Sequence, residues 1–316
     1  MKVLVTGACG YKGTVLVPKL LAAGHSVVAV DTMWFGNDLS PHSRLKIIRG
    51  DVRDPAQLPL TGIEAIIHLS SVANDPCGDL DPKLTWEVSC LATMQLADKA
   101  ARMGIRHFIY ASSGSVYGLK EEADVTENLD LVPLSEYNKT KMVAERVLLS
   151  YANEMVVQVV RPATVCGLSP RMRLDVSVNM LTMQALTLGE ITVLGGEQTR
   201  PNIHIDDITD LYLFLLEHPN VTGIYNAGFE NLSILAIAEM ASQKAQAQIK
   251  ILPSNDPRSY RVNSDKLLAT GFKPKKMVID AIDEICKAHH EGRLRNEDRF
   301  YNLKWMQKTL FPQAVK

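Results

Sequence analysis

The stretch Val5-Thr6-Gly7-Ala8-Cys9-Gly10-Tyr11-Lys12-Gly13 decides the fold of this chain. It follows a short apolar run at residues 2–6, typical of a buried strand, and precedes apolar residues at helical spacing up to residue 23. In such a unit the first glycine permits a tight turn, the second lets the backbone approach a pyrophosphate, and the third lets the helix pack on the strand. Free N–H groups and the positive dipole end of the helix then face the phosphates. The stretch therefore predicts a dinucleotide site formed by Gly7, Gly10, Tyr11, Lys12 and Gly13.

Short apolar strands and helices alternate through the first 165 residues. This alternation is typical of βαβ units on a parallel sheet. Helices are predicted at 11–23, 85–103 and 136–154, and a further helix at 206–216 returns to the sheet. Strands are predicted at 2–6, 25–31, 45–49, 63–69, 106–111, 155–161 and 223–227.

The rhythm of strands and helices changes after Arg161-Pro162, where arginine-bearing loops and shorter strands begin. We therefore expect an α/β fold with two parts. The first is a Rossmann doubly wound parallel sheet in residues 1–165, to which residues 202–228 return. The second is a smaller, discontinuous C-terminal substrate-binding lobe in residues 166–201 and 229–316. The charged and aromatic last twenty residues have no assignment.

The composition excludes several classes of protein. The net charge of −1 over 316 residues provides no basic field to attract nucleic acid or anionic lipid. No apolar run approaches the ~20 residues that a membrane helix needs, and the first residues run directly into the glycine loop rather than into a signal peptide. The five cysteines are scattered, without metal-binding spacing, so we expect no metal and reduced thiols in a cytoplasmic protein.

Asp31 ends the second predicted strand, eighteen residues after Gly13. A carboxylate there accepts hydrogen bonds from the adenosine ribose hydroxyls and repels a 2′-phosphate. The next residues, Thr32-Met33-Trp34, include no arginine, so the cofactor is expected to be NAD rather than NADP. Asp51 and Val52 end the third strand and are expected to flank the adenine; a loop cap is the alternative interpretation for Asp51.

Tyr137 and Lys141 lie four residues apart in a predicted helix, so they share one face. A free phenol has a pKa of about 10 and is a poor base at pH 7. The ammonium of Lys141 and an oxidised nicotinamide both favour phenolate, and a pKa near 7 requires roughly 4 kcal/mol of differential stabilisation. The spacing, together with the glycine loop, therefore predicts Tyr137 as a base beside a bound nicotinamide.

A third catalytic group is expected at the end of the fifth strand, in Ser112-Ser113-Gly114-Ser115. A serine hydroxyl there can polarise a substrate hydroxyl or carbonyl and relay a proton to the tyrosine. The spacing alone does not choose among the three serines.

These motifs together resemble the extended short-chain dehydrogenase/reductases that act on nucleotide sugars, and in particular the UDP-galactose 4-epimerase-like enzymes. The resemblance covers most of the chain. It rests on Gly7-x-x-Gly10-x-x-Gly13, Asp31, Asp51-Val52, His68-Leu69-Ser70-Ser71, Ser112 to Gly118, Tyr137-x-x-x-Lys141, Arg161-Pro162-Ala163-Thr164 and Arg200 to Asp207.

The resemblance implies roles for individual residues. The catalytic serine falls on Ser113, beside Tyr137 and Lys141, and further cofactor contacts fall on Leu69, Ser70, Ser71 and Pro162. For the nucleotide sugar the implied contacts are Asn74, Ser113, Ser115, Thr164, Asn179, Arg200 and Arg258, with Arg171 and Arg173 as additional candidates for the diphosphate. Arginines suit phosphate because their planar fork donates two parallel hydrogen bonds.

The reaction class follows from a departure within the resemblance. Nucleotide-sugar 4,6-dehydratases carry Thr-Asp-Glu where this chain has Ser113-Gly114-Ser115, and elimination of water needs that additional acid and base. The resemblance therefore implies an NAD-dependent C4 epimerase that works through a transient 4-keto sugar. The alternatives are an NAD-dependent 4-dehydrogenase or 4-keto-reductase with the same residues, and a non-catalytic NAD-binding regulator. Thr164 in place of a usual Asn, and Ser70-Ser71 in place of an Ala pair, leave the sugar open.

The resemblance also implies a homodimer. In the resembling family the two long helices, here 85–103 and 136–154, form a four-helix bundle between subunits. We therefore expect a nucleotide-diphosphate sugar and a second copy of this chain as partners, and neither nucleic acid nor membrane.

Overall fold

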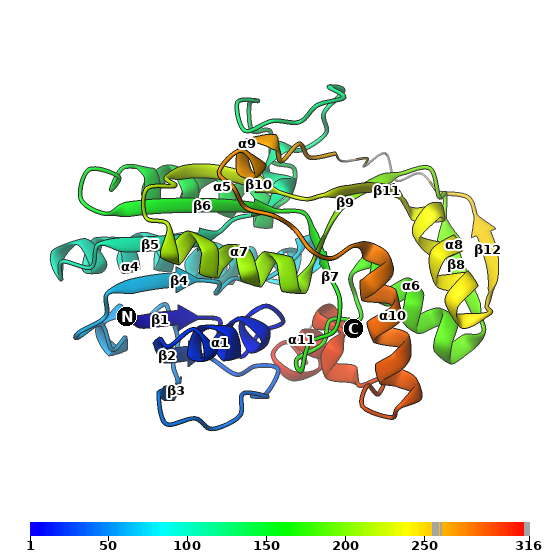
Figure 1. Ribbon diagram of the computed structural model, residues 1–316, viewed down its shortest axis with the longest axis horizontal. Coiled ribbons are helices and arrows are strands. Elements are labelled where there is room, and N and C mark those ends of the chain that lie inside the picture. The colour runs from blue at the N-terminus through cyan, green and yellow to red at the C-terminus, as the bar shows by residue number, and fades with distance from the viewer. Residues whose placement is uncertain (255–258, 260, 313–316) are drawn as a thin grey trace.

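The computed structural model describes residues 1–254, 259 and 261–312. Its centre is a parallel sheet of seven strands in the order β10-β6-β5-β4-β1-β2-β3 (Figure 1). The connection from β3 to β4 carries the chain from one half of this sheet to the other. The strand order therefore reverses between the neighbours β1 and β4, as in doubly wound folds. The strands are β1 (Lys2–Thr6), β2 (Ser26–Asp31), β3 (Leu45–Arg49), β4 (Ala65–His68), β5 (His107–Ala111), β6 (Val156–Pro162) and β10 (Gly223–Ala227). The predicted Rossmann sheet is therefore confirmed.

Helices cover both faces of the sheet because successive strand residues point to opposite sides. On one face, Val3 and Val5 join a core with α1 (Gly13–Ala22) and α7 (Ile205–Glu217). On the other face, Leu4 joins a second core with α4 (Ala92–Arg102) and α5 (Glu136–Leu149). This arrangement buries the sheet on both sides and leaves the carboxyl ends of its strands free for a site.

Two of the predicted helices differ from the structure by more than two residues at one end. The helix expected at 85–103 is preceded by α2 (Asp75–Leu80) and begins as α3 (Pro82–Trp86); it then passes through a π-helical turn (Glu87–Leu91) into α4. The helix expected at 136–154 ends at Leu149, because residues 150–155 turn to bring the chain into β6. Short 3₁₀ turns lie at Pro55–Gln57, Gly114–Tyr117 and Asp298–Phe300.

Most of the remaining elements pack beside the carboxyl ends of the large sheet, on the right of Figure 1, whereas α9 (Asp265–Leu268) lies beside β10. A three-stranded sheet contains β7 (Thr164–Cys166), β9 (Thr199–His204) and β11 (Glu230–Ser233), and a parallel pair contains β8 (Glu190–Leu194) and β12 (Gln248–Leu252). The helices are α6 (Ser177–Leu188), α8 (Ile234–Ala245), α9 (Asp265–Leu268), α10 (Val278–His290) and α11 (Asn302–Thr309). A separate core lies between α6, α8 and α10.

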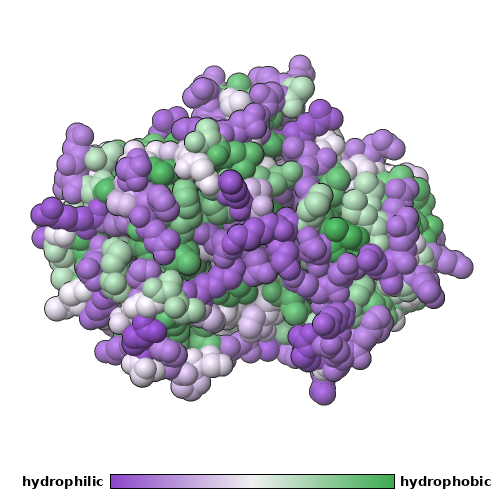
Figure 2. Space-filling view, viewed as in Figure 1, coloured by the Kyte–Doolittle hydropathy of each residue, from purple (hydrophilic) through white to green (hydrophobic). Residues whose placement is uncertain are grey.

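The face of the molecule drawn in Figure 2 is mostly polar. Figure 2 shows hydrophilic side chains that separate several small hydrophobic areas. Among the residues described, no helix combines the length and the apolar character that a membrane span needs.

Candidate active site

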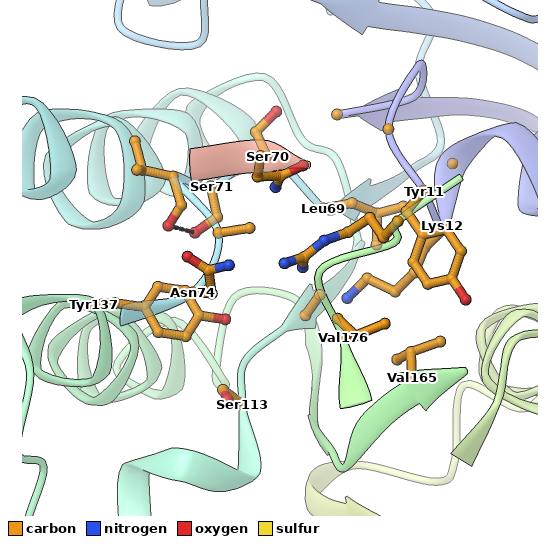
Figure 3. A pocket seen from close by; sticks show the side chains of 18 of the residues that line it. Tyr11, Lys12, Leu69, Ser70, Ser71, Asn74, Ser113, Tyr137, Val165 and Val176 are labelled. Atoms are coloured by element: carbon orange, nitrogen blue, oxygen red, sulfur yellow. Dashed lines mark hydrogen bonds between the residues drawn. The ribbon is translucent and has the colours of Figure 1, made fainter. Parts of the chain in front are cut away.

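A cavity of about 520 Å³ lies at the carboxyl ends of the sheet strands, between the large sheet and the segments that contain the start of α6, β9 and α11. Figure 3 shows Tyr137 and Lys12 pointing into it from opposite sides, with Asn74 and Ser113 at its edges. Every predicted cofactor residue lines this cavity: Gly7, Gly10, Tyr11, Lys12, Gly13, Asp31, Asp51, Val52, Leu69, Ser70, Ser71, Tyr137, Lys141 and Pro162. The topology thus brings residues from six separate segments to one place.

The glycine loop is shaped by close backbone contacts. Gly7 has φ +69°, and a Cβ added to it would lie 2.7 Å from the backbone nitrogen of Ser70. A Cβ on Gly13 would lie 2.4 Å from the carbonyl oxygen of Ala8. Gly10 instead leaves its side toward the cavity open, since a Cβ there meets only the Gly7 oxygen, at 3.2 Å. This loop and the N-terminus of α1 fit a pyrophosphate group.

Two acids lie toward one end of the cavity, but their surroundings differ. The Asp31 carboxylate accepts hydrogen bonds from the backbone N–H groups of Cys9 (3.0 Å) and Met33 (2.7 Å). Burial raises the pKa of Asp31 above its ordinary value, although these hydrogen bonds act in the opposite direction. Burial acts likewise on Asp51, but the hydrogen bonds and charge of Arg53, 2.7 Å away, outweigh it and lower the pKa of Asp51. The Asp31 carboxylate is therefore held in place by backbone N–H groups, whereas that of Asp51 is paired with an arginine.

The three predicted catalytic side chains meet at the other end of the cavity. Ser113 follows β5, and its hydroxyl lies 2.7 Å from that of Ser115. Tyr137 is in the first turn of α5, whose N-terminus is capped by the side chain of Ser135. The Lys141 ammonium donates to the carbonyl oxygen of Ala111 (2.8 Å) and lies 5.9 Å from the centre of the Tyr137 ring. This arrangement can hold a phenol, a hydroxyl and an ammonium around one reacting carbon.

Burial dominates the pKa values of Tyr137 and Lys141 in the protein alone. Burial raises the pKa of Tyr137 to about 12, and a hydrogen bond with Ser113 lowers it only in part. Burial also lowers the pKa of Lys141 to about 7, helped by the charge of Lys12 and opposed by Glu145. Desolvation thus penalises both charged groups in the protein alone, and the lowered phenol pKa expected from Lys141 together with an oxidised nicotinamide stays a prediction.

The substrate residues predicted from the resemblance are only partly brought together. Asn74, Ser113, Ser115, Thr164 and Arg200 line the cavity. Asn74 also caps α2 by accepting a hydrogen bond from the N–H of Cys77, with an uncommon φ of 74° for a residue with a side chain. Arg258 lies outside the described residues.

Asn179 is buried away from the cavity, so its predicted phosphate contact is wrong. Its amide nitrogen donates to the Tyr11 hydroxyl (3.0 Å) and to the carbonyl oxygen of Arg173 (2.9 Å). Its oxygen accepts from the N–H of Gly167 (3.0 Å). All polar atoms of this side chain are engaged, and they tie the glycine loop to the chain before α6.

Ser177 and Arg173 do line the cavity close to the start of α6. Ser177 is the first residue of α6, and its buried hydroxyl has no hydrogen-bond partner among the described residues. The same holds for the Nη2 atom of Arg173, while the Nε of Arg173 donates to Asp175 (2.8 Å). Both side chains line the cavity. Arg173 was a secondary candidate in the sequence, whereas Ser177 gave no signal beyond its place at a helix start.

The C-terminal segment also contributes to the cavity, through Asn302 and Met306 of α11. Its apolar residues Leu303, Met306 and Leu310 follow helical spacing, and this was the one available signal. Nothing in that spacing indicates which surface the helix covers.

Comparison with known proteins identifies the family to which the chain is similar. The family model described as "NAD dependent epimerase/dehydratase family" matches residues 3–228. UDP-glucose 4-epimerase of Mycolicibacterium smegmatis is 31% identical over an alignment of 229 positions, which covers 67% of this chain and 72% of that protein. UDP-glucuronic acid decarboxylase 1 of Xenopus tropicalis is 29% identical over 95% of this chain and 74% of its own length. UDP-glucuronic acid 4-epimerase from Bacillus cereus, solved with UDP-glucuronic acid and NAD, is 27% identical over 92% of this chain and 99% of its own, with a TM-score of 0.78.

Proposed function

Because this chain belongs to the NAD dependent epimerase/dehydratase family, we propose that it is an NAD-dependent nucleotide-sugar epimerase that inverts C4 of a UDP-sugar through a transient 4-keto sugar. The observation that carries this proposal is the meeting of Ser113, Tyr137 and Lys141 in one cavity with the glycine loop. The loop of residues 113–115 offers hydroxyls and no carboxylate, which favours epimerisation over dehydration.

NAD would be held by the glycine loop and the N-terminus of α1 at its pyrophosphate, and by Asp31 at the adenosine ribose. Val52, Leu69, Ser70, Ser71 and Pro162 would line the remaining length of the cofactor. When bound there, the cofactor would supply reversible hydride chemistry at C4 of the sugar. An enzyme of this kind regenerates its cofactor in every cycle, so it has no need to exchange it.

The side chains of the protein would handle the proton. Tyr137 would remove the proton of the C4 hydroxyl as the carbon is oxidised, and would return it after the keto sugar has turned over. Ser113 would hold that oxygen, since its hydroxyl already lies beside Tyr137 and Ser115. Because burial keeps the phenol protonated, positive charge on Lys141 and Lys12 and from the oxidised cofactor would be needed to form phenolate.

The substrate diphosphate would lie at the N-terminus of α6, against Ser177, Arg173 and Arg200. The sugar would contact Asn74, Ser115 and Thr164. We accordingly assign residues 1–165 with 202–228 to cofactor binding, and residues 166–201 and 229–316 to the nucleotide sugar. The separate core between α6, α8 and α10 supports that division.

Nuclear magnetic resonance of UDP-sugars incubated with the purified protein, without added nicotinamide, tests the function. We expect an equilibrium mixture of two C4 epimers, because a retained cofactor makes the reaction redox-neutral. A first panel of UDP-glucose, UDP-galactose, UDP-glucuronic acid and UDP-N-acetylglucosamine covers neutral, acidic and amidated sugars. Unchanged sugars that give stoichiometric NADH once NAD is added would instead indicate a 4-dehydrogenase, and NAD binding with no turnover of any sugar would indicate a regulator.

We also propose a homodimer in the cytosol. Leu91 and Met94, three residues apart on the helix that ends with α4, are exposed by 43% and 40%. Apolar side chains at this spacing suit a helical interface with a second copy. All five cysteines are free and buried, as suits a reducing compartment. Sedimentation that shows only monomer at micromolar concentration would contradict the dimer.

A further inference from the structure

The C-terminal clasp, defined as residues 298–311, lies across the loop that follows β2. In the view of Figure 1, α11 is seen between α1 and α10. The indole N–H of Trp305 donates to the carbonyl oxygen of Trp34 (2.7 Å). The guanidinium of Arg299 donates to both carboxylate oxygens of Asp38, at 2.7 and 3.1 Å. Two polar anchors therefore fix the clasp to the segment that begins at Asp31.

The inner side of the clasp lines the Asp31 end of the cavity. Met306 is 2% exposed and belongs to a buried cluster with Val52. Asn302 accepts a hydrogen bond from the Nη2 of Arg171 (2.6 Å), and the Arg171 guanidinium lies 4.1 Å from the centre of the Phe35 ring. All of these side chains line the same cavity as Asp31 and Asp51.

We propose that the C-terminal clasp forms the outer wall of the adenosine subsite, with Met306 against the adenine, and that it must detach before the cofactor can enter or leave. The inference rests on the proposed function only for the identity of the cofactor. In the proposed site Asp31 marks the position of the ribose and Val52 that of the adenine. Met306, from the C-terminal part of the chain, packs into the same cluster as Val52. The flat aromatic face of adenine suits the flexible thioether of Met306 and the apolar wall around it.

Detachment would involve residues 302–311, because Phe300 at the start of the clasp is 3% exposed and belongs to the core shared with α1 and α7. Arg299 and Asp38 remain 25% and 23% exposed, and the cluster around Met306 is separate from the two cores of the large sheet. Segments held by small clusters and part-exposed polar contacts are those that open locally without global unfolding. Retention of NAD would then depend on the anchors of the clasp as well as on contacts with the cofactor.

The rate of NAD release from the loaded full-length protein tests this proposal. Protein saturated with NAD is freed of excess cofactor by gel filtration and diluted, and NAD in the filtrate is followed over time with no sugar present. Arg299→Gln should release NAD at least ~10-fold faster, since most affinity changes within one binding site appear in the dissociation rate. Met306→Ala should do the same by removing the wall itself. Lys308→Ala, on the same helix and paired with the exposed Asp298 in the described part of the chain, is the matched control.

The outcomes separate this inference from the proposed function. Release at the wild-type rate from folded Arg299→Gln and Met306→Ala proteins would overturn the clasp and leave epimerisation untouched. Because no sugar is present, faster release supports the clasp even if no UDP-sugar is turned over. A wild-type protein that binds no NAD would contradict both.

Discussion

Replacement of Tyr137 with Phe should lower kcat by about 10³-fold or more, because it removes the proton acceptor that oxidation at C4 requires. The change deletes only one oxygen. The backbone and Cβ of Tyr137, which Gly78 of α2 approaches closely, would be unchanged. Affinity for NAD should stay within about threefold, because the glycine loop and Asp31 carry most of the expected contacts. Turnover is measured by NMR of the epimers, and NAD affinity by calorimetry.

Tyr225→Phe is the matched control for this prediction. The Tyr225 hydroxyl donates to the carbonyl oxygen of Thr222 (3.0 Å), and Tyr225 does not line the cavity. It should therefore retain full activity. If Tyr137→Phe kept more than a tenth of wild-type turnover, another group would have to accept the proton, and the proposed mechanism would be wrong.

The parts of the site that depend on short spacing were predictable from the sequence. Gly7, Gly10 and Gly13 need only a preceding strand and a following helix, and both are visible as hydrophobic patterns. Tyr137 and Lys141 share a helix face whatever the tertiary structure. The parallel sheet then requires the ends of β1, β4 and β5 to meet, because the carboxyl ends of parallel strands lie at one edge.

The remaining features depend on contacts distant in sequence. Asn179 and Tyr11 are far apart in the chain, and their hydrogen bond removes Asn179 from the cavity in favour of Ser177. The pKa of Tyr137 is set by burial, which only the packed structure determines. The position of Met306 beside Val52 could not be predicted either, since an amphipathic pattern shows that a helix has an apolar face and not what that face covers.

A large loss of stability is expected when Arg161, whose side chain is 2% exposed, is replaced. Its Nη2 and Nε donate to the carboxylate of Glu145, at 2.7 and 3.0 Å, and its Nη1 donates to the Tyr117 hydroxyl (2.7 Å). Glu145 lies four residues after Lys141 on α5, so this pair joins the helix that carries the catalytic residues to β6 of the sheet. Arg161→Met would leave the Glu145 carboxylate buried without its partner.

Arg161→Met should therefore lower the free energy of unfolding by about 3–5 kcal/mol, the usual effect of removing one member of a buried ion pair. Urea unfolding measures this loss. Arg102→Met is the control, because the Arg102–Asp98 pair is exposed and should contribute less than about 1 kcal/mol. Adding Glu145→Gln to Arg161→Met should recover part of the stability, since a neutral amide is less costly to bury than a carboxylate. If the single variant were as stable as Arg102→Met, the Glu145 carboxyl would have to be neutral in the fold, and apolar packing alone would hold α5 against the sheet.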